Sequence, residues 1–201
     1  MPAEPAPPAA GARAHSWREY TPQELVDTAS RLAGDGNIGI AYTYNEPMVW
    51  HEFVLDTARL ARAHGQENVL VTNGYVNRAP LEELLPHISA MNIDLKGDDA
   101  FYQEMCKGRR APVEASIRAA HAAGCHVEAT FLLVSGQNDS IERVDAIASW
   151  LASVSPDIPL HLSRFFPTYR MANARATDVR FVLRAADAAR ARLRHVYTGN
   201  M

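Results

Sequence analysis

The sequence has few cysteines and lysines and no long hydrophobic run. Among its 201 residues only Cys106 and Cys125 are cysteines, too few and too far apart for a disulfide framework or a metal knuckle. No apolar stretch approaches the roughly 18 residues of a membrane span, and the first residues lack the hydrophobic segment of a secretory signal. The net charge of −3 provides no basic excess for nucleic acid. We therefore expect a cytoplasmic globular protein with neither nucleic acid nor membrane as a partner.

Lysine is nearly replaced by arginine. Of the 20 basic residues only Lys96 and Lys107 are lysines. A lysine ammonium is compact and can lose its proton, whereas the planar guanidinium of arginine keeps its charge. In a chain that prefers arginine so strongly, each remaining lysine is mildly informative about function.

Strand-like and helix-like segments alternate along most of the chain. Residues 1–20 are rich in proline and alanine and are predicted to be disordered, whereas 21–201 form one domain. Strands are expected at 38–44, 68–72, 90–96, 126–134, 159–165 and 195–198. Helices are expected at 21–33, 47–64, 79–87, 98–105, 112–123, 140–154 and 177–193. Because each connection holds a helix, the strands should be parallel and the class α/β.

Three successive strands carry polar residues on one face only. The alternation is clearest where Asn92, Asp94 and Lys96 interleave with apolar residues. A parallel sheet covered by helices on both faces would be almost continuously apolar. The pattern favours a partial, open TIM-like (β/α) barrel with a polar lumen. An antiparallel sheet with one wet face is the alternative, which the intervening helices oppose.

Polar residues cluster where the predicted strands end, the place where α/β folds carry their chemistry. Each cluster also has a structural interpretation. Asn45 or Glu46 before Pro47 could cap a helix, and Thr72-Asn73-Gly74 could be only a turn. Asp94 and Lys96 could form a structural ion pair, but a partly buried pair contributes little stability, which favours a functional role.

Histidines give a weaker signal. His126 and Glu128 share one strand face, and His161 lies on the next strand. Imidazole and carboxylate can bind a metal ion. Because no third imidazole or carboxylate cluster accompanies them, hydrogen bonding in the lumen is the preferred interpretation, and we predict no metal ligands. Cys106 and Cys125 are expected to be inert.

Taken together, these segments resemble radical S-adenosylmethionine (SAM) proteins. The likeness is closest to the AmmeMemoRadiSam-system radical SAM enzymes, relatives of the pyruvate formate-lyase-activating enzymes. It is carried by the ordered segments 41–47, 71–75, 92–97, 136–140, 159–165 and 196–200. The resemblance implies a (β/α)₆ barrel, with the family's first strand missing here. It also implies a [4Fe-4S] cluster that reduces SAM to give a 5′-deoxyadenosyl radical.

The resemblance also implies which residues bind SAM. Residues 44–47 resemble the family's Gly-Gly-Glu-Pro element, which meets the methionyl ammonium, and Asp94 and Lys96 resemble an Asp-x-Lys at the polar end of SAM. The full expected SAM set is Tyr44, Asn45, Glu46, Thr72, Asn73, Asp94, Lys96 and His161. Further lumen or substrate residues are expected to be His126, Glu128, Thr130, Asn138, Ser163 and Arg164.

The family's Cys-x₃-Cys-x₂-Cys motif is absent, and Cys106 and Cys125 lie at the wrong places to replace it. We therefore expect a core fragment that binds SAM weakly and cannot hold the cluster alone, with a protein of the AmmeMemoRadiSam system as its substrate or partner. One alternative is a Schiff-base lyase of the aldolase type that uses Lys96. Another is a non-catalytic barrel that binds a ligand or a partner protein.

Overall fold

Six parallel strands in chain order form one open sheet in the computed structural model, which describes residues 18–201. The disorder predicted over residues 1–20 falls mostly outside this range. The strands are β1 Gly39–Tyr42, β2 Glu67–Thr72, β3 Ala90–Asp94, β4 His126–Leu133, β5 Leu160–Arg164 and β6 Val196–Gly199. The predicted α/β class with a partial, open barrel is confirmed.

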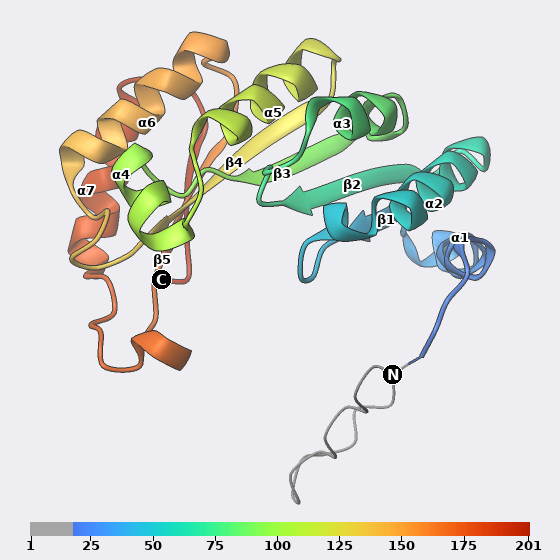
Figure 1. Cartoon of the computed structure of the whole chain (residues 1–201), viewed down its shortest axis with the longest axis horizontal. Helices are drawn as coiled ribbons and strands as arrows, with labels where there is room; N and C mark the ends of the chain where they lie inside the picture. Colours follow the sequence, from blue (N-terminus) through green and yellow to red (C-terminus); the bar gives the residue numbers. More distant parts are fainter. Residues whose placement is uncertain (1–17) are drawn as a thin grey trace, which may run out of the picture.

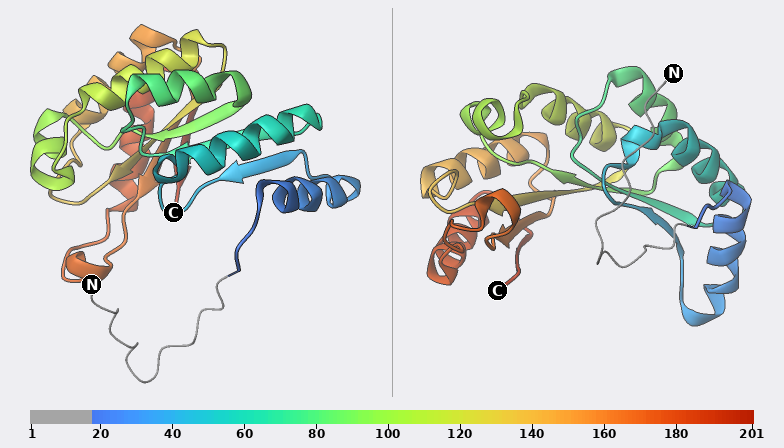
Figure 2. Two further views of the ribbon diagram at one scale, coloured as in Figure 1. Left: turned by 45° about the vertical axis from the view of Figure 1, so that its right-hand side comes forward. Right: turned by 60° about the horizontal axis from the view of Figure 1, so that its bottom comes forward.

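The helices follow the strands in alternation (Figure 1). They are α1 Pro22–Arg31, α2 His51–Ala63, α3 Arg78–Leu84, α4 Asp99–Phe101, α5 Ala111–Ala122, α6 Ile141–Val154 and α7 Val179–Arg190. Short 3₁₀ turns are η1 Ala33–Asp35, η2 Pro47–Trp50, η3 Leu85–His87 and η5 Tyr169–Met171, and η4 Tyr102–Cys106 is a π-helical turn. The long helices cover the convex face of the curved sheet and leave its concave inner face open (Figure 2).

The alternation of the strands places the core on the helix side. Apolar residues such as Met91, Ile93 and Phe131 are almost fully buried there. The intervening polar residues face the open side, as in the lumen of a barrel. The first helix begins where expected, because Thr21 and Glu24 form a capping box.

One buried polar side chain ties the start of the sheet to its helices. Asn68 on β2 is fully buried, and its amide donates to the carbonyl oxygens of Ala58 and His87, each at 3.0 Å. It also accepts a hydrogen bond of 2.9 Å from the Tyr42 hydroxyl, and burial raises the pKa of that phenol. The single amide thus joins β1, β2, α2 and η3.

Replacing this amide should therefore be costly. In Asn68→Ala, two carbonyl oxygens and one hydroxyl lose their partner inside the core, and the free energy of unfolding should fall by about 3 kcal/mol. Urea denaturation followed by circular dichroism measures this. The control Asn77→Ala removes an exposed amide without a side-chain cap bond and should change stability by less than about 0.5 kcal/mol. Equal effects of the two variants would contradict the role given to Asn68.

Within residues 18–201, none of the helices combines the length and the apolar character needed to cross a membrane.

Candidate functional site

The carboxyl ends of β1, β2 and β3 enclose one polar hollow. It has a volume of about 410 Å³, and seven of the residues predicted to bind SAM line it together with Thr43 and Val71: Tyr44, Asn45, Glu46, Thr72, Asn73, Asp94 and Lys96. Residues from three strand ends therefore converge, because parallel strands end at the same edge of a sheet. His161 does not line this hollow and lies farther along the inner face.

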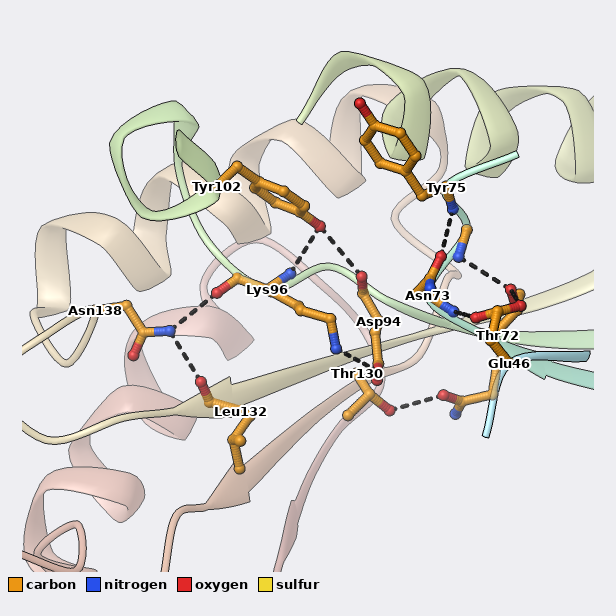
Figure 3. Close-up of polar contacts among 12 residues, drawn as sticks. Glu46, Thr72, Asn73, Tyr75, Asp94, Lys96, Tyr102, Thr130, Leu132 and Asn138 are labelled. Carbon is orange, nitrogen blue, oxygen red and sulfur yellow. Dashed lines mark hydrogen bonds and ion pairs between the residues drawn. The ribbon is translucent and has the colours of Figure 1, made fainter. Parts of the chain in front are cut away.

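Glu46 connects the ends of β1 and β2. Its carboxylate accepts hydrogen bonds from the Thr72 hydroxyl at 2.6 Å and the Asn73 backbone N–H at 2.7 Å (Figure 3). It also accepts from the Met48 backbone N–H at 3.1 Å. It is also the N-cap residue of η2. Both carboxylate oxygens are thus engaged within the protein. The capping role considered for Glu46 is real, and the side chain positions the hollow's wall.

Asp94 and Lys96 form an ion pair in the wall of the hollow, with Lys96 Nζ 2.7 Å from Asp94 Oδ2 (Figure 3). Each side chain remains more than one-third exposed, so a ligand can reach both charges. Such an exposed pair contributes little to stability. The contact shows that the Lys96 side chain can hold a carboxylate, as binding of an anionic ligand would require.

Two residues hold the backbone that carries this pair. Tyr102 on the π-helical turn accepts from the Lys96 N–H at 3.1 Å and donates to the Asp94 carbonyl at 3.3 Å. Asn138, which we predicted for the lumen, is fully buried and donates to the carbonyl oxygens of Lys96 and Leu132, each at 2.9 Å (Figure 3). A ligand would have no access to Asn138, so its role is to position Lys96.

The inner face continues from this pair as a row across the sheet. Asp94, Thr130, His161 and Tyr197 are register partners on β3, β4, β5 and β6. The His161 ring stacks on the Tyr197 ring with centroids 5.3 Å apart. Neighbouring parallel strands lie about 4.8 Å apart, so the row leads directly from the hollow to His161.

On β4, two residues before Thr130, Glu128 bridges two imidazoles. Its carboxylate lies 3.1 Å from His126 Nε2 and 2.8 Å from His161 Nε2. Partial burial alone would raise the pKa of Glu128, but the hydrogen bonds and charges of the two histidines outweigh it and hold that pKa below its ordinary value. The arrangement agrees with the expected hydrogen bonding in the lumen.

The remaining predicted lumen residues divide into accessible and engaged ones. Thr130 and Ser163 line a smaller hollow of about 270 Å³ that also reaches Asp94 and Lys96. Thr130 additionally donates to the Asn92 side chain at 2.8 Å. Arg164 is directed elsewhere, because its Nε donates to the Thr177 carbonyl and its guanidinium stacks on Phe166.

Tyr102 and Tyr197 belong to the site but are not among the residues predicted from the sequence. Tyr102 is almost fully buried, and burial raises the pKa of its phenol to about 12, with the Lys96 N–H acting in the opposite direction. No spacing pattern distinguished Tyr102 from a core aromatic. Tyr197 occupies the position on the last strand that continues the polar alternation of its neighbours, and that signal could have identified it.

Similarity to known proteins shows the family of this chain. The sequence model of the family described as "Radical SAM superfamily" matches residues 9–151 of this chain. The chain belongs to the radical SAM superfamily. It is 38% identical over 187 residues to a protein of Methanocaldococcus jannaschii, a match covering 92% of this chain and 55% of the relative. The chain thus spans about half the length of that curated relative.

Solved structures share the fold of this radical SAM chain at low identity. A domain of pyruvate-formate lyase-activating enzyme from Bacteroides vulgatus has a TM-score of 0.68 at 19% identity, covering 81% of this chain and 99% of that one. A radical SAM methyltransferase from Sphaerobacter thermophilus has a TM-score of 0.66 at 17% identity, covering 90% and 58%. SuiB from Streptococcus suis bound to S-adenosylmethionine has 0.67 at 13% identity, covering 92% and 45%. These likenesses concern the fold alone.

The described residues do not fit the iron–sulfur cluster that the superfamily implies. Such clusters are held by thiolates, and Cys106 is exposed while Cys125 is buried beside β4. Within residues 18–201, no three His, Cys, Asp or Glu side chains are grouped to hold a metal ion. SAM is a different case, because the strand-end hollow offers a cation and a carboxylate side by side.

The Glu128 bridge should make stability depend on acid pH. Because the folded-state pKa lies below the ordinary value of 4.5, this stabilisation is present above about 4.5 and is lost as the pH falls through the folded-state pKa. Glu128→Gln should therefore be less stable than the wild type at pH 6, and the gap should shrink towards pH 3. Urea unfolding at both pH values measures it.

The matched control for this prediction is Glu104→Gln. It neutralises an exposed carboxylate on the π-helical turn, and its gap to the wild type should stay nearly constant over the same pH range. A gap that is constant for Glu128→Gln, or that widens in acid, would contradict the bridge.

Proposed function

We propose that this chain binds SAM at the strand-end hollow, as a single core domain over residues 21–201 of the AmmeMemoRadiSam branch. The observation that carries the proposal is the accessible Asp94–Lys96 pair in a hollow lined by three strand ends. The methionyl end of SAM carries one carboxylate and one ammonium. A paired cation and carboxylate offer complementary, charge-assisted partners for both groups.

In this proposal each residue of the hollow has a distinct task. Lys96 binds the methionyl carboxylate, and Asp94 accepts from the ammonium or from a ribose hydroxyl. The backbone at Tyr44 and Asn45 supplies further acceptors. Glu46 holds the loop and Asn73 in place through its three internal hydrogen bonds, instead of contacting SAM directly. Bound SAM would supply the adenosyl group on which the superfamily's chemistry depends.

The substrate would lie along the inner face. The row from Asp94 through Thr130 to His161 runs away from the hollow, and Ser163 and the Glu128 bridge border it. SuiB is known bound to its precursor peptide, which supports a protein or peptide as the substrate class here. His161, positioned by Glu128 and Tyr197, would contact that substrate.

Affinity for SAM tests the hollow. Isothermal titration calorimetry should show weak binding of SAM to the wild type. The Lys96→Met variant should bind SAM about tenfold more weakly, or worse. A charge-assisted hydrogen bond contributes about 1.5–3 kcal/mol, and 1.4 kcal/mol corresponds to tenfold in affinity. Arg109→Met removes an exposed positive charge outside the hollow and should leave binding unchanged. Unchanged affinity in Lys96→Met, or no binding to the wild type, would refute the proposal.

We also propose that this chain alone does not supply ligands for an iron–sulfur cluster, and cluster assembly tests this. After anaerobic reconstitution with iron and sulfide, the purified chain should lack the visible absorbance of a four-iron cluster. It should also release no deoxyadenosine from SAM. The double variant Cys106→Ser with Cys125→Ser should behave identically. A stable cluster that is lost in the double variant would show that these two cysteines are ligands.

A further inference from the structure

A second cavity lies beside the strand-end hollow, on the side of α2 and the π-helical turn. Its volume is about 830 Å³. One wall comes from η2 and the start of α2, another from the loop after β2, and the third from the π-helical turn η4 and the residues after it. Glu46, Asn73 and Lys96 line both the cavity and the hollow. The two spaces are therefore neighbours that share a wall.

Both lysines of the chain line this cavity. Lys107 is exposed, and within residues 18–201 its ammonium makes no hydrogen bond or ion pair. Its backbone is left-handed with φ of 56°, a conformation that costs energy for a residue with a long side chain. It directly follows the π-helical turn, a distortion frequent at functional sites. The local fold thus holds one of the two lysines at the cavity in an unfavourable conformation.

The remaining wall is largely apolar. Met48, Val49, Val76 and Pro80 contribute to it, and the Tyr75 ring, which lies beside Gly108, also lines it. The carboxylate of Glu46 accepts three internal hydrogen bonds, which leave few of its lone pairs for a further donor. Glu52 adds one exposed carboxylate at the start of α2. The cavity therefore combines an apolar surface with two carboxylates and two ammonium groups. The Lys96 ammonium is paired with Asp94, which leaves Lys107 as the cation that a ligand in the cavity can contact.

We propose that this cavity is a second ligand site, which binds an organic carboxylate with an apolar body, such as a hydrophobic amino acid or a peptide carboxyl terminus. The carboxylate contacts Lys107, and Lys96 lies within the shared wall. The apolar body packs against Met48, Val49, Val76 and Pro80. The inference does not depend on SAM binding, because the strand-end hollow is a separate space.

The single exposed thiol provides a direct readout of this cavity. Cys106 lines it and is exposed, whereas Cys125 is buried. Partial burial raises the pKa of the Cys106 thiol, with Lys96 acting in the opposite direction, so alkylation by iodoacetamide is best followed at mildly alkaline pH. Intact-protein mass spectrometry counts the adduct. A ligand in the cavity should slow this reaction.

N-acetyl-leucine and N-acetyl-leucinamide form the matched probe pair, because they share one apolar body and differ only in the carboxylate. N-acetyl-leucine should slow alkylation with half-maximal effect in the millimolar range, as its small size implies. N-acetyl-leucinamide should protect at least about fivefold less well, since a charge-assisted hydrogen bond is lost. Equal protection by both probes, or protection by neither, would overturn the proposal.

Two variants test whether Lys107 supplies the positive charge that binds the carboxylate. Lys107→Asn removes the ammonium while asparagine tolerates the left-handed backbone, and it should abolish the preference for N-acetyl-leucine. Arg109→Asn removes a charge two residues further on, outside the cavity, and should keep the preference. A preference that survives in Lys107→Asn would overturn the assignment of Lys107.

SAM is the third probe and separates this inference from the proposed function. At concentrations that saturate the strand-end hollow in calorimetry, SAM should slow Cys106 alkylation far less than N-acetyl-leucine does. Strong protection of Cys106 by SAM would mean that the cavity belongs to the SAM site and would overturn the inference while supporting the proposed function. Protection by N-acetyl-leucine without any SAM binding would support the inference and refute the proposed function.

Discussion

The three hydrogen bonds accepted by the Glu46 carboxylate hold the site together. They join the loop after β1, the first turn of η2 and the end of β2. A carboxylate that accepts from two backbone N–H groups and one hydroxyl fixes their relative position. The wall shared by the hollow and the neighbouring cavity depends on this contact.

The one-sided cover of the sheet is the second constraint. Because the long helices pack only on the convex face, the core takes the apolar half of each strand and the inner face can remain polar. A row of register partners from Asp94 to His161 and Tyr197 can therefore stay hydrated or bind a ligand. The same architecture leaves β1 and β6 paired on one edge only within the described residues.

Periodicity predicted the fold well because it reports burial directly. The six strands lie within about two residues of the expected ranges, and the barrel follows from their polar face. The site was less predictable, because a sequence shows which polar residues converge but not which already have partners. Glu46 and Asn138 were expected to contact ligand, yet their side chains are engaged by the protein. Tyr102 was not predicted because its contacts to residues 94 and 96 depend on the π-helical turn, and no sequence pattern predicts that turn.

Lys96 lies where the two spaces meet, and this position has a thermodynamic consequence. Its ammonium is paired with Asp94. A carboxylate bound in either space competes with Asp94 for the Lys96 ammonium. A ligand that binds this ammonium from one space therefore makes it less available to a ligand in the other space. By linkage, each ligand then alters the affinity of the other by the same factor. Lys107 belongs to the cavity alone, so charge removal there acts on one space without disturbing this competition.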